Sequence, residues 1–89
     1  MPEQEFNQAA QRYLDMVYRI ALNALRRPAD AEDAAQTVML RLWQTQEAFE
    51  GEDHLRHWLV RVTVNVCRDL TRSAWYRRIV PLEHCPEPT

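Results

Sequence analysis

One stretch of the chain, from Leu55 to Arg78, combines side chains suited to an anion with side chains suited to a core. At the 100° per residue of an α-helix, its polar residues gather on one side and its apolar residues on another. The polar side holds Arg61, Asn65, Arg68 and Arg72, and the apolar side holds Leu55, Leu59, Val62, Val66 and Leu70. Guanidinium groups pair with phosphates and asparagine can bond the edges of bases, so the polar side suits nucleic acid. The solvated face of an ordinary amphipathic helix has the same spacing.

Further residues extend this polar side at both ends. His54 and His57 precede it, Arg77 and Arg78 follow it, and Trp58 falls where the polar and apolar sides meet. Because aromatic rings stack on bases of any sequence, an aromatic group beside an arginine stripe favours the nucleic-acid interpretation.

The elements that position these residues are predicted to be helices. Eighty-nine residues make one domain with a single modest core, and the only glycine in the chain leaves little room for tight hairpins. The apolar share of 46% is ordinary for a globular protein. We therefore expect an all-α domain of three helices over residues 1–78.

The net charge of −2 conceals an uneven distribution. Residues 1–54 hold five arginines and ten acidic residues, whereas residues 55–82 hold six arginines and only Asp69 as an acid. All eleven basic residues are arginine, which favours planar, bidentate contacts but is also what a GC-rich genome would encode.

The first helix is predicted from apolar residues that recur at three- and four-residue steps: Phe6, Ala10, Tyr13, Val17, Ile20, Ala21 and Ala24. Arg26 and Arg27 are expected in its last turn, where cations stabilise the helix dipole, and Pro28 is expected to end it. This helix is interpreted as scaffold.

The second helix is predicted over about residues 31–49, with Asp30 as its N-cap. Its core stripe is expected to be Ala31, Ala35, Val38, Leu42 and Phe49. On the opposite face lie Asp33, Gln36, Leu40, Trp43 and Glu47, so two large apolar side chains project among polar ones. Such a face is typical of a protein docking surface, although a middle helix can also be buried on both flanks.

Several kinds of chemistry find little support in the sequence. Glu50, Glu52 and Asp53 surround Gly51 without the ligand spacing of a calcium loop, and His54 with His57 lacks a partner pair for zinc, so no metal is expected. There is no phosphate-binding glycine loop or nucleophile motif, so we expect neither a cofactor nor an enzyme.

The cysteines and the overall hydropathy indicate a soluble, cytoplasmic protein. Cys67 and Cys85 are interpreted as unpaired thiols in a reducing compartment. The polar, acidic N-terminus does not resemble a signal peptide, and no segment approaches the roughly 20 apolar residues of a membrane span. Residues 79–89 lose helical periodicity and contain three prolines, so we expect them to begin a linker to a further domain.

Two segments in order resemble region 2 of a bacterial RNA polymerase sigma factor of the extracytoplasmic-function (ECF) group. The first is DAEDAAQTVMLRLW, residues 30–43, and the second is WLVRVTVNVCRDLTR, residues 58–72. The resemblance covers roughly residues 13–78 and includes a Phe-x-Gly loop between the two segments. It implies a three-helix unit that holds the clamp of core RNA polymerase and opens the minus-ten promoter element, without a catalytic residue.

The resemblance also implies roles for individual positions. Asp33, Gln36 and Leu40 match positions that contact the clamp, and we add Trp43 as their neighbour on the same face. Phe49 and the loop up to His54 match the segment that receives a base flipped from the non-template strand, while Asn65 matches an amide that contacts promoter bases. The DNA-binding set is thus expected to be Phe49, Trp58, Arg61, Asn65, Arg68, Arg72, Arg77 and Arg78. Asp69 is interpreted as structural, paired with Arg72 or Asn65.

Two departures from the family pattern affect this interpretation. Thr37 stands where an acid commonly follows the glutamine, so the clamp contact is expected to be rearranged. The loop is unusually acidic, and one hypothesis is that a loop carboxylate accepts a hydrogen bond from the exocyclic amine of the flipped base. A solvated acidic turn is the simpler interpretation.

Two alternatives to promoter melting remain open. The same faces would suit a protein-interaction module that binds an anti-sigma factor or self-associates. A helix-turn-helix regulator that reads duplex DNA is disfavoured, because the short glycine turn between paired helices is missing.

Overall fold

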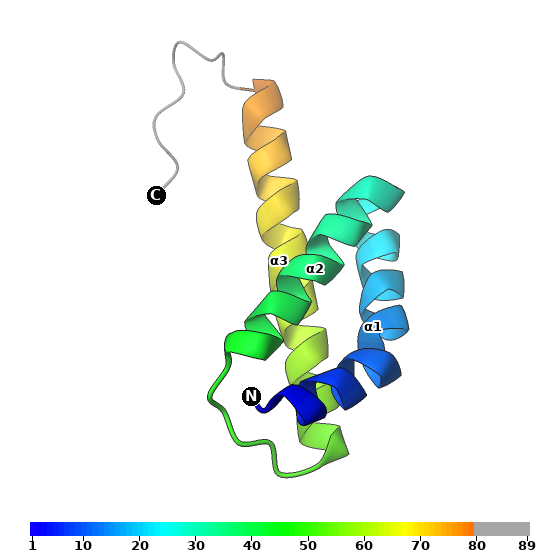
Figure 1. Cartoon of the computed structure of the whole chain (residues 1–89). Coiled ribbons are helices and arrows are strands. Elements are labelled where there is room, and N and C mark those ends of the chain that lie inside the picture. The colour runs from blue at the N-terminus through cyan, green and yellow to red at the C-terminus, as the bar shows by residue number, and fades with distance from the viewer. Residues whose placement is uncertain (80–89) are drawn as a thin grey trace.

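The computed structural model is a bundle of three α-helices (Figure 1): α1, Glu3–Leu25; α2, Pro28–Gln44; and α3, Glu52–Ile79. It describes the backbone of residues 1–79 and the side chains of residues 1–73. No strand occurs within residues 1–79, which confirms the predicted all-α fold. The linker was predicted over residues 79–89, but Ile79 is the last residue of α3. Residues 80–89 lie outside the described residues.

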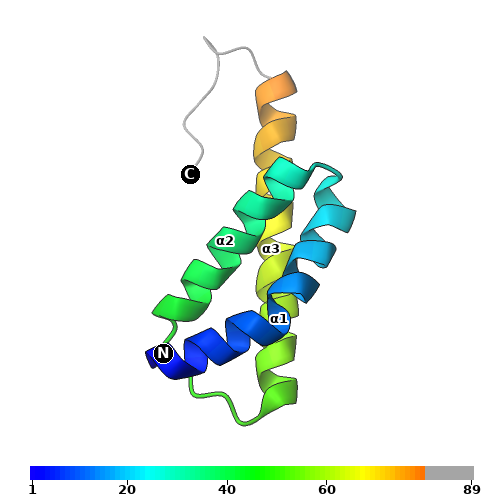
Figure 2. The ribbon, with the colours of Figure 1, turned by 45° about the vertical axis from the view of Figure 1, so that its right-hand side comes forward.

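Each helix packs against the other two. Figures 1 and 2 show that α1 changes direction after its first turns, so that its N-terminal part passes below the end of α2 while its later turns run beside α2. In both views the C-terminal turns of α3 extend beyond the other two helices. The C-terminal part of α3 therefore has fewer neighbours than its middle.

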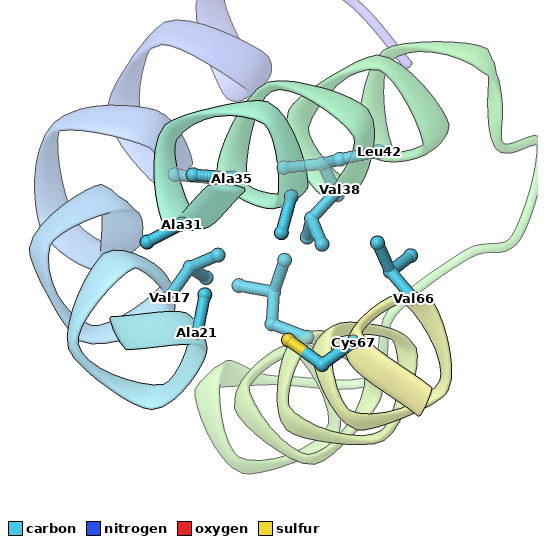
Figure 3. Packing of buried hydrophobic residues seen from close by; sticks show 11 residues of the cluster. Val17, Ala21, Ala31, Ala35, Val38, Leu42, Val66 and Cys67 are labelled. Atoms are coloured by element: carbon cyan, nitrogen blue, oxygen red, sulfur yellow. The ribbon is translucent and has the colours of Figure 1, made fainter. Parts of the chain in front are cut away.

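The core is made largely of small side chains (Figure 3). Its fully or almost fully buried apolar residues are Ala9, Val17, Ala21, Ala31, Ala34, Ala35, Val38, Leu42, Leu59, Val66 and Cys67. Because five of these are alanine, the helix backbones can approach closely. Thr63 is also buried, and its hydroxyl donates a 2.6 Å hydrogen bond to the Leu59 carbonyl, so this polar group is satisfied within its own helix.

Most of the predicted core stripe of α2 is confirmed, but those of α1 and α3 need correction. On α1, Val17 and Ala21 are buried, whereas Ala24 is exposed and Ala9 is more deeply buried than Ala10. On α3, Leu59 and Val66 are buried, and Thr63 and Cys67 join them. Leu70 was expected in the core and is 38% exposed.

The start of α2 also differs from the prediction. Asp30 is not the N-cap: the helix begins at Pro28, with Arg27 as N-cap and Asp30 in the first turn. A proline suits the first helical position, because its fixed φ is helical and its missing N–H would have no intrahelical partner there. Pro28 thus starts α2 as well as following α1. The preceding helix ends at Leu25, and Arg26 adopts the left-handed conformation with its N–H on the Leu22 carbonyl at 2.8 Å.

The other end of α2 comes earlier than expected, so Phe49 lies in a loop. Thr45 is extended after Gln44, and its hydroxyl oxygen accepts a 3.2 Å hydrogen bond from the Glu47 N–H. This local bond gives the backbone an alternative to another helical turn. The loop ends at Gly51, whose φ of 152° suits glycine and whose carbonyl accepts the Leu55 N–H as α3 begins.

Within the part of the chain that the structure describes, no helix combines the length and apolar character needed to cross a membrane.

Candidate nucleic-acid interface

The face of α3 that points away from the core presents all four predicted polar contacts of the middle of the helix. Arg61, Asn65, Arg68 and Arg72 are exposed, while Leu59, Thr63 and Val66 turn inward. Within residues 1–73, none of the three arginines forms an ion pair. Their guanidinium donors are therefore available to an external anion.

Asp69 does not have the partners predicted for it. Among the described side chains it makes neither an ion pair with Arg72 nor a hydrogen bond with Asn65. Both possible partners are exposed, and a helical spacing of three or four residues permits such a pair without enforcing it. The side chains of Arg77 and Arg78 lie outside the described residues.

An aromatic cluster lies at the start of this face. The Phe49 ring meets the His54 ring edge-to-face at a centroid distance of 5.2 Å, and it meets the Trp58 ring in the same manner at 5.6 Å. Phe49, Leu55 and Trp58 are partly buried against the core. The cluster attaches the loop to the first turns of α3 and fixes where the loop lies relative to Asn65.

One loop-end carboxylate is already engaged by α1. Glu52 forms an ion pair with Arg12 at 2.9 Å and accepts a hydrogen bond from the Tyr13 hydroxyl. The Tyr13 hydrogen bond, followed by Arg12, lowers the pKa of Glu52, and the same hydrogen bond raises the pKa of Tyr13. We name Arg12, Tyr13 and Glu52 the α1–α3 tether.

The tether reduces the number of loop acids that could accept a hydrogen bond from a flipped base. Glu52 is committed to α1, and Asp53 lies 3.4 Å from Arg56 on its own helix. Within residues 1–73, the Glu50 carboxylate makes no ion pair or hydrogen bond, so of the three acids it is the one left open to a ligand.

A second exposed surface lies between α1 and α2. Leu40 is 54% exposed and Trp43 44% exposed, and Asp33 and Gln36 on the same face of α2 are also exposed. Leu14 of α1, 45% exposed, lines the same groove, and Phe6 meets the Trp43 ring edge-to-face at 5.1 Å. We name this surface the α1–α2 groove.

Residues of α1, the helix interpreted as scaffold, form one wall of the groove. The available signal was Leu14, an apolar residue off the predicted stripe. Thr37, the departure noted in α2, is half-buried and donates a 2.9 Å hydrogen bond to the Asp33 carbonyl. Its hydroxyl is thus used within the helix.

The described region contains neither a cluster of potential metal ligands nor an exposed thiol. No three His, Cys, Asp or Glu side chains within it gather as metal ligands would. Cys67 is a buried free thiol, and burial raises its pKa, which disfavours the reactive thiolate. Cys85 lies outside the described residues.

Comparison with known proteins identifies the fold. The profile of the family described as Sigma-70 region 2 matches residues 9–77. The chain belongs to this family. Region 2 thus covers all of α2 together with most of α1 and α3.

Similar proteins place this region 2 domain in the ECF group. It is 47% identical over 38 residues to ECF RNA polymerase sigma factor SigG of Mycobacterium tuberculosis, a match that covers 43% of the chain and 10% of SigG. It is 36% identical over 66 residues to ECF RNA polymerase sigma factor SigL of the same species, covering 73% of the chain and 37% of SigL. The chain thus spans well under two thirds of these relatives. No solved structure matches it significantly.

The resemblance inferred from residues 30–43 and 58–72 is confirmed at the level of family and group. The roles of individual residues in this region 2 domain stay predictions. The structure brings Phe49, Trp58 and Asn65 to one side of α3. Gln36, Leu40 and Trp43 line the α1–α2 groove, whereas Asp33 is exposed outside this lining.

Proposed function

We propose that this region 2 domain acts in transcription initiation, binding core RNA polymerase and capturing single-stranded promoter DNA of the minus-ten element. The observation that carries the proposal is the outward face of α3, where three exposed arginines without ion pairs in the described region flank Asn65. Arginine fixes phosphates and asparagine can read base edges, so the face suits a strand whose bases are accessible. The relatives named as ECF RNA polymerase sigma factors support the same assignment. The role is regulatory and involves no catalytic residue of this chain.

The proposed mechanism is capture of the non-template strand after a base leaves the duplex. Unstacking and unpairing a base costs a few kcal/mol. Phosphate contacts by Arg61, Arg68 and Arg72 offset this cost, and stacking on an aromatic side chain contributes about 1–3 kcal/mol per base. In this mechanism Phe49 and Trp58, at the start of the face, supply the stacking, and Asn65 reads a base edge.

The groove side of α2 is assigned to the polymerase clamp. Asp33 and Gln36 supply polar contacts, and Leu40 and Trp43 supply exposed apolar area, which is the composition of an interface core with a polar rim. The two proposed surfaces lie on different helices, so polymerase binding and strand capture can occur together.

Fluorescence anisotropy with labelled oligonucleotides tests strand capture. The native domain is expected to bind short single strands in a sequence-dependent manner and more tightly than matching duplexes. Asn65→Ala is expected to weaken binding to the preferred strand by about 1–3 kcal/mol. Asn7→Ala, an exposed asparagine on α1, is the matched control. Tighter binding to duplexes, or equal effects of the two variants, would contradict strand capture.

Polymerase docking needs a separate test, because the α1–α2 groove favours a second candidate function. As a protein-interaction module, the domain would use Leu40 to hold an anti-sigma factor or another copy of itself, without DNA contact. Leu40→Asp is expected to abolish pull-down of core RNA polymerase, with Leu70→Asp, another exposed leucine, as control. If Leu40→Asp abolishes self-association instead and Arg72→Ala leaves strand binding unchanged, the interaction module is the better assignment.

A further inference from the structure

His54 attaches the loop to the start of α3 through both of its ring nitrogens and through an aromatic contact of its ring. Its Nδ1 accepts a 3.0 Å hydrogen bond from the Glu50 backbone N–H. Its Nε2 lies 3.7 Å from a carboxylate oxygen of Glu47, and its ring packs edge-to-face against Phe49. One side chain thus contacts three loop residues, at positions 47, 49 and 50.

The hydrogen bond at Nδ1 determines the protonation state that this arrangement requires. A backbone N–H can only donate, so Nδ1 must offer its lone pair and the proton of the neutral ring must sit on Nε2. That places the Nε2 proton on the side of Glu47. A doubly protonated ring has no acceptor at Nδ1 and would set its N–H against the N–H of Glu50.

We propose that His54 is a positioning residue that locks the loop in the neutral form of its ring, and that protonation of Nδ1 releases the lock. The inference rests on the proposed function where it concerns DNA: the locked loop holds Phe49 between His54 and Trp58, where a base would be captured. Acidification then weakens strand capture by freeing the loop, although it adds a positive charge beside the arginine face.

The charged groups around His54 come from the loop, from α3 and from α1. Glu47 faces Nε2 from the loop, and on α3 the neighbouring titratable groups are Asp53, which pairs with Arg56, and His57. From α1, Arg12 and Tyr13 are held by Glu52 instead. Glu47 attracts the protonated ring but cannot replace the acceptor that Glu50 loses.

The lock itself is tested without DNA by NMR spectroscopy of the whole chain. The Glu50 amide resonance of the native domain is expected to move as the pH is lowered, because protonation of Nδ1 removes its hydrogen-bond acceptor. His54→Asn keeps an amide oxygen near the position of Nδ1, so its Glu50 amide is expected to stay protected from hydrogen exchange and to lose its pH response. His54→Gln places its amide near the position of Nε2 and is expected to expose the Glu50 amide. His57→Gln, on the exposed neighbour, is the control.

The binding consequence is tested with the same variants and single strands. His54→Asn and His54→Gln remove the same ring and the same potential charge, so a difference between them isolates the hydrogen bond to Glu50. His54→Gln is expected to weaken binding about fivefold relative to His54→Asn, the effect of one typical hydrogen bond. Equal losses in the two variants, or a Glu50 amide indifferent to pH and to His54→Gln, would overturn the lock. If the Glu50 amide responds as expected but neither these variants nor Asn65→Ala affects strand binding, the lock stands and the proposed function fails.

Discussion

Arg26 holds an unusual backbone conformation among the described residues. Its φ is 64°, and apart from it only Gly51 has a positive φ within residues 1–79. The left-handed conformation lets the Arg26 N–H bond the Leu22 carbonyl and turns the chain from α1 into α2. For a residue with a Cβ this conformation costs about 1–2 kcal/mol, whereas glycine adopts it freely.

Replacing Arg26 with glycine is therefore expected to stabilise the domain. The relief of strain exceeds the extra entropy of the unfolded chain, so we expect a gain of about 1 kcal/mol, or about 4–8 °C in Tm for a domain of this size. Thermal unfolding followed by circular dichroism measures it. Arg27→Gly is the control, because Arg27 is extended with φ −129° and gains nothing from glycine. A fall in Tm for Arg26→Gly would show that the strain is compensated by contacts of the arginine side chain.

For individual residues, the sequence patterns predicted that helix boundaries occur, but they were less accurate about the residue at which each helix begins or ends. Asp30 and Pro28 both signal a helix start, and they compete for the same turn. Pro28 determines the outcome because its ring fixes φ at a helical value, while a capping aspartate stabilises a start without forcing it. Thr45 is a similar case, since its side chain competes with the helix for a backbone N–H and ends α2 before Phe49.

Among the three helices, α2 contributes the most buried alanines to the core. Three of its alanines, Ala31, Ala34 and Ala35, are buried, and two of them have no exposed surface at all. A small side chain at these positions sets how closely the other helices can approach, so the positions tolerate little added volume.

Ala34→Leu is expected to destabilise the domain by about 1–3 kcal/mol, because the added side chain must displace neighbouring helices. Ala29→Leu makes the same change at an exposed position of α2 and is expected to have little effect. Chemical denaturation of both variants measures the difference in the free energy of unfolding, provided that the dependence of this free energy on denaturant concentration is the same in both. Equal stability of the two variants would mean that the space around Ala34 can be repacked.

The α1–α3 tether makes one inter-helix contact depend on pH. The folded pKa of Glu52 is lowered from an ordinary value of 4.5, so its contribution to stability is present above that value and is lost as the pH falls through the folded pKa. The pKa of Tyr13 is raised from an ordinary 10.0, so its contribution is present below that value and is lost as the pH rises through the folded pKa.

Tyr13→Phe is accordingly expected to lower Tm slightly between about pH 5 and pH 10 and to have less effect beyond either limit. The loss is small because the tether is exposed to solvent and salt screens it. Tyr18→Phe, a half-buried tyrosine on the same helix, is the control for removal of a hydroxyl. A Tm difference that stays constant across the whole pH range would assign the effect of Tyr13→Phe to packing rather than to Glu52.

The architecture could be predicted from the sequence because it depends on periodicity, which each helix shows by itself. The tether, the α1–α2 groove and the His54 contacts could not, because they join residues from separate helices or from a loop whose path is not periodic. Tyr13 and Glu52 are 39 positions apart, and neither residue type signals the other.

In the molecule as a whole, acidic and basic residues are concentrated in different parts of the chain. The first 54 residues hold ten acidic residues against five arginines, while the outward face of α3 presents arginines without ion pairs in the described region. A cationic face on a domain of net charge −2 attracts a strand locally while the remaining surface repels it. Strand binding should therefore be oriented and strongly dependent on salt.

The salt dependence of binding counts the phosphate contacts of this face. With about four phosphates neutralised, the slope of log K against log salt on single strands is expected to be near −3, at about −0.7 for each phosphate. Arg61→Ala and Arg68→Ala are each expected to make the slope less negative by about 0.7, because each removes one contact. Arg19→Ala makes the same charge change on α1, where Arg19 pairs with Asp15, and is expected to leave the slope unchanged. Asn65→Ala is expected to lower affinity without changing the slope, since an amide releases no counterion.

Anisotropy titrations between low and moderate salt distinguish these outcomes. If all three arginine variants change the slope equally, the response reflects net charge alone, and the face of α3 has no specific role in holding the strand.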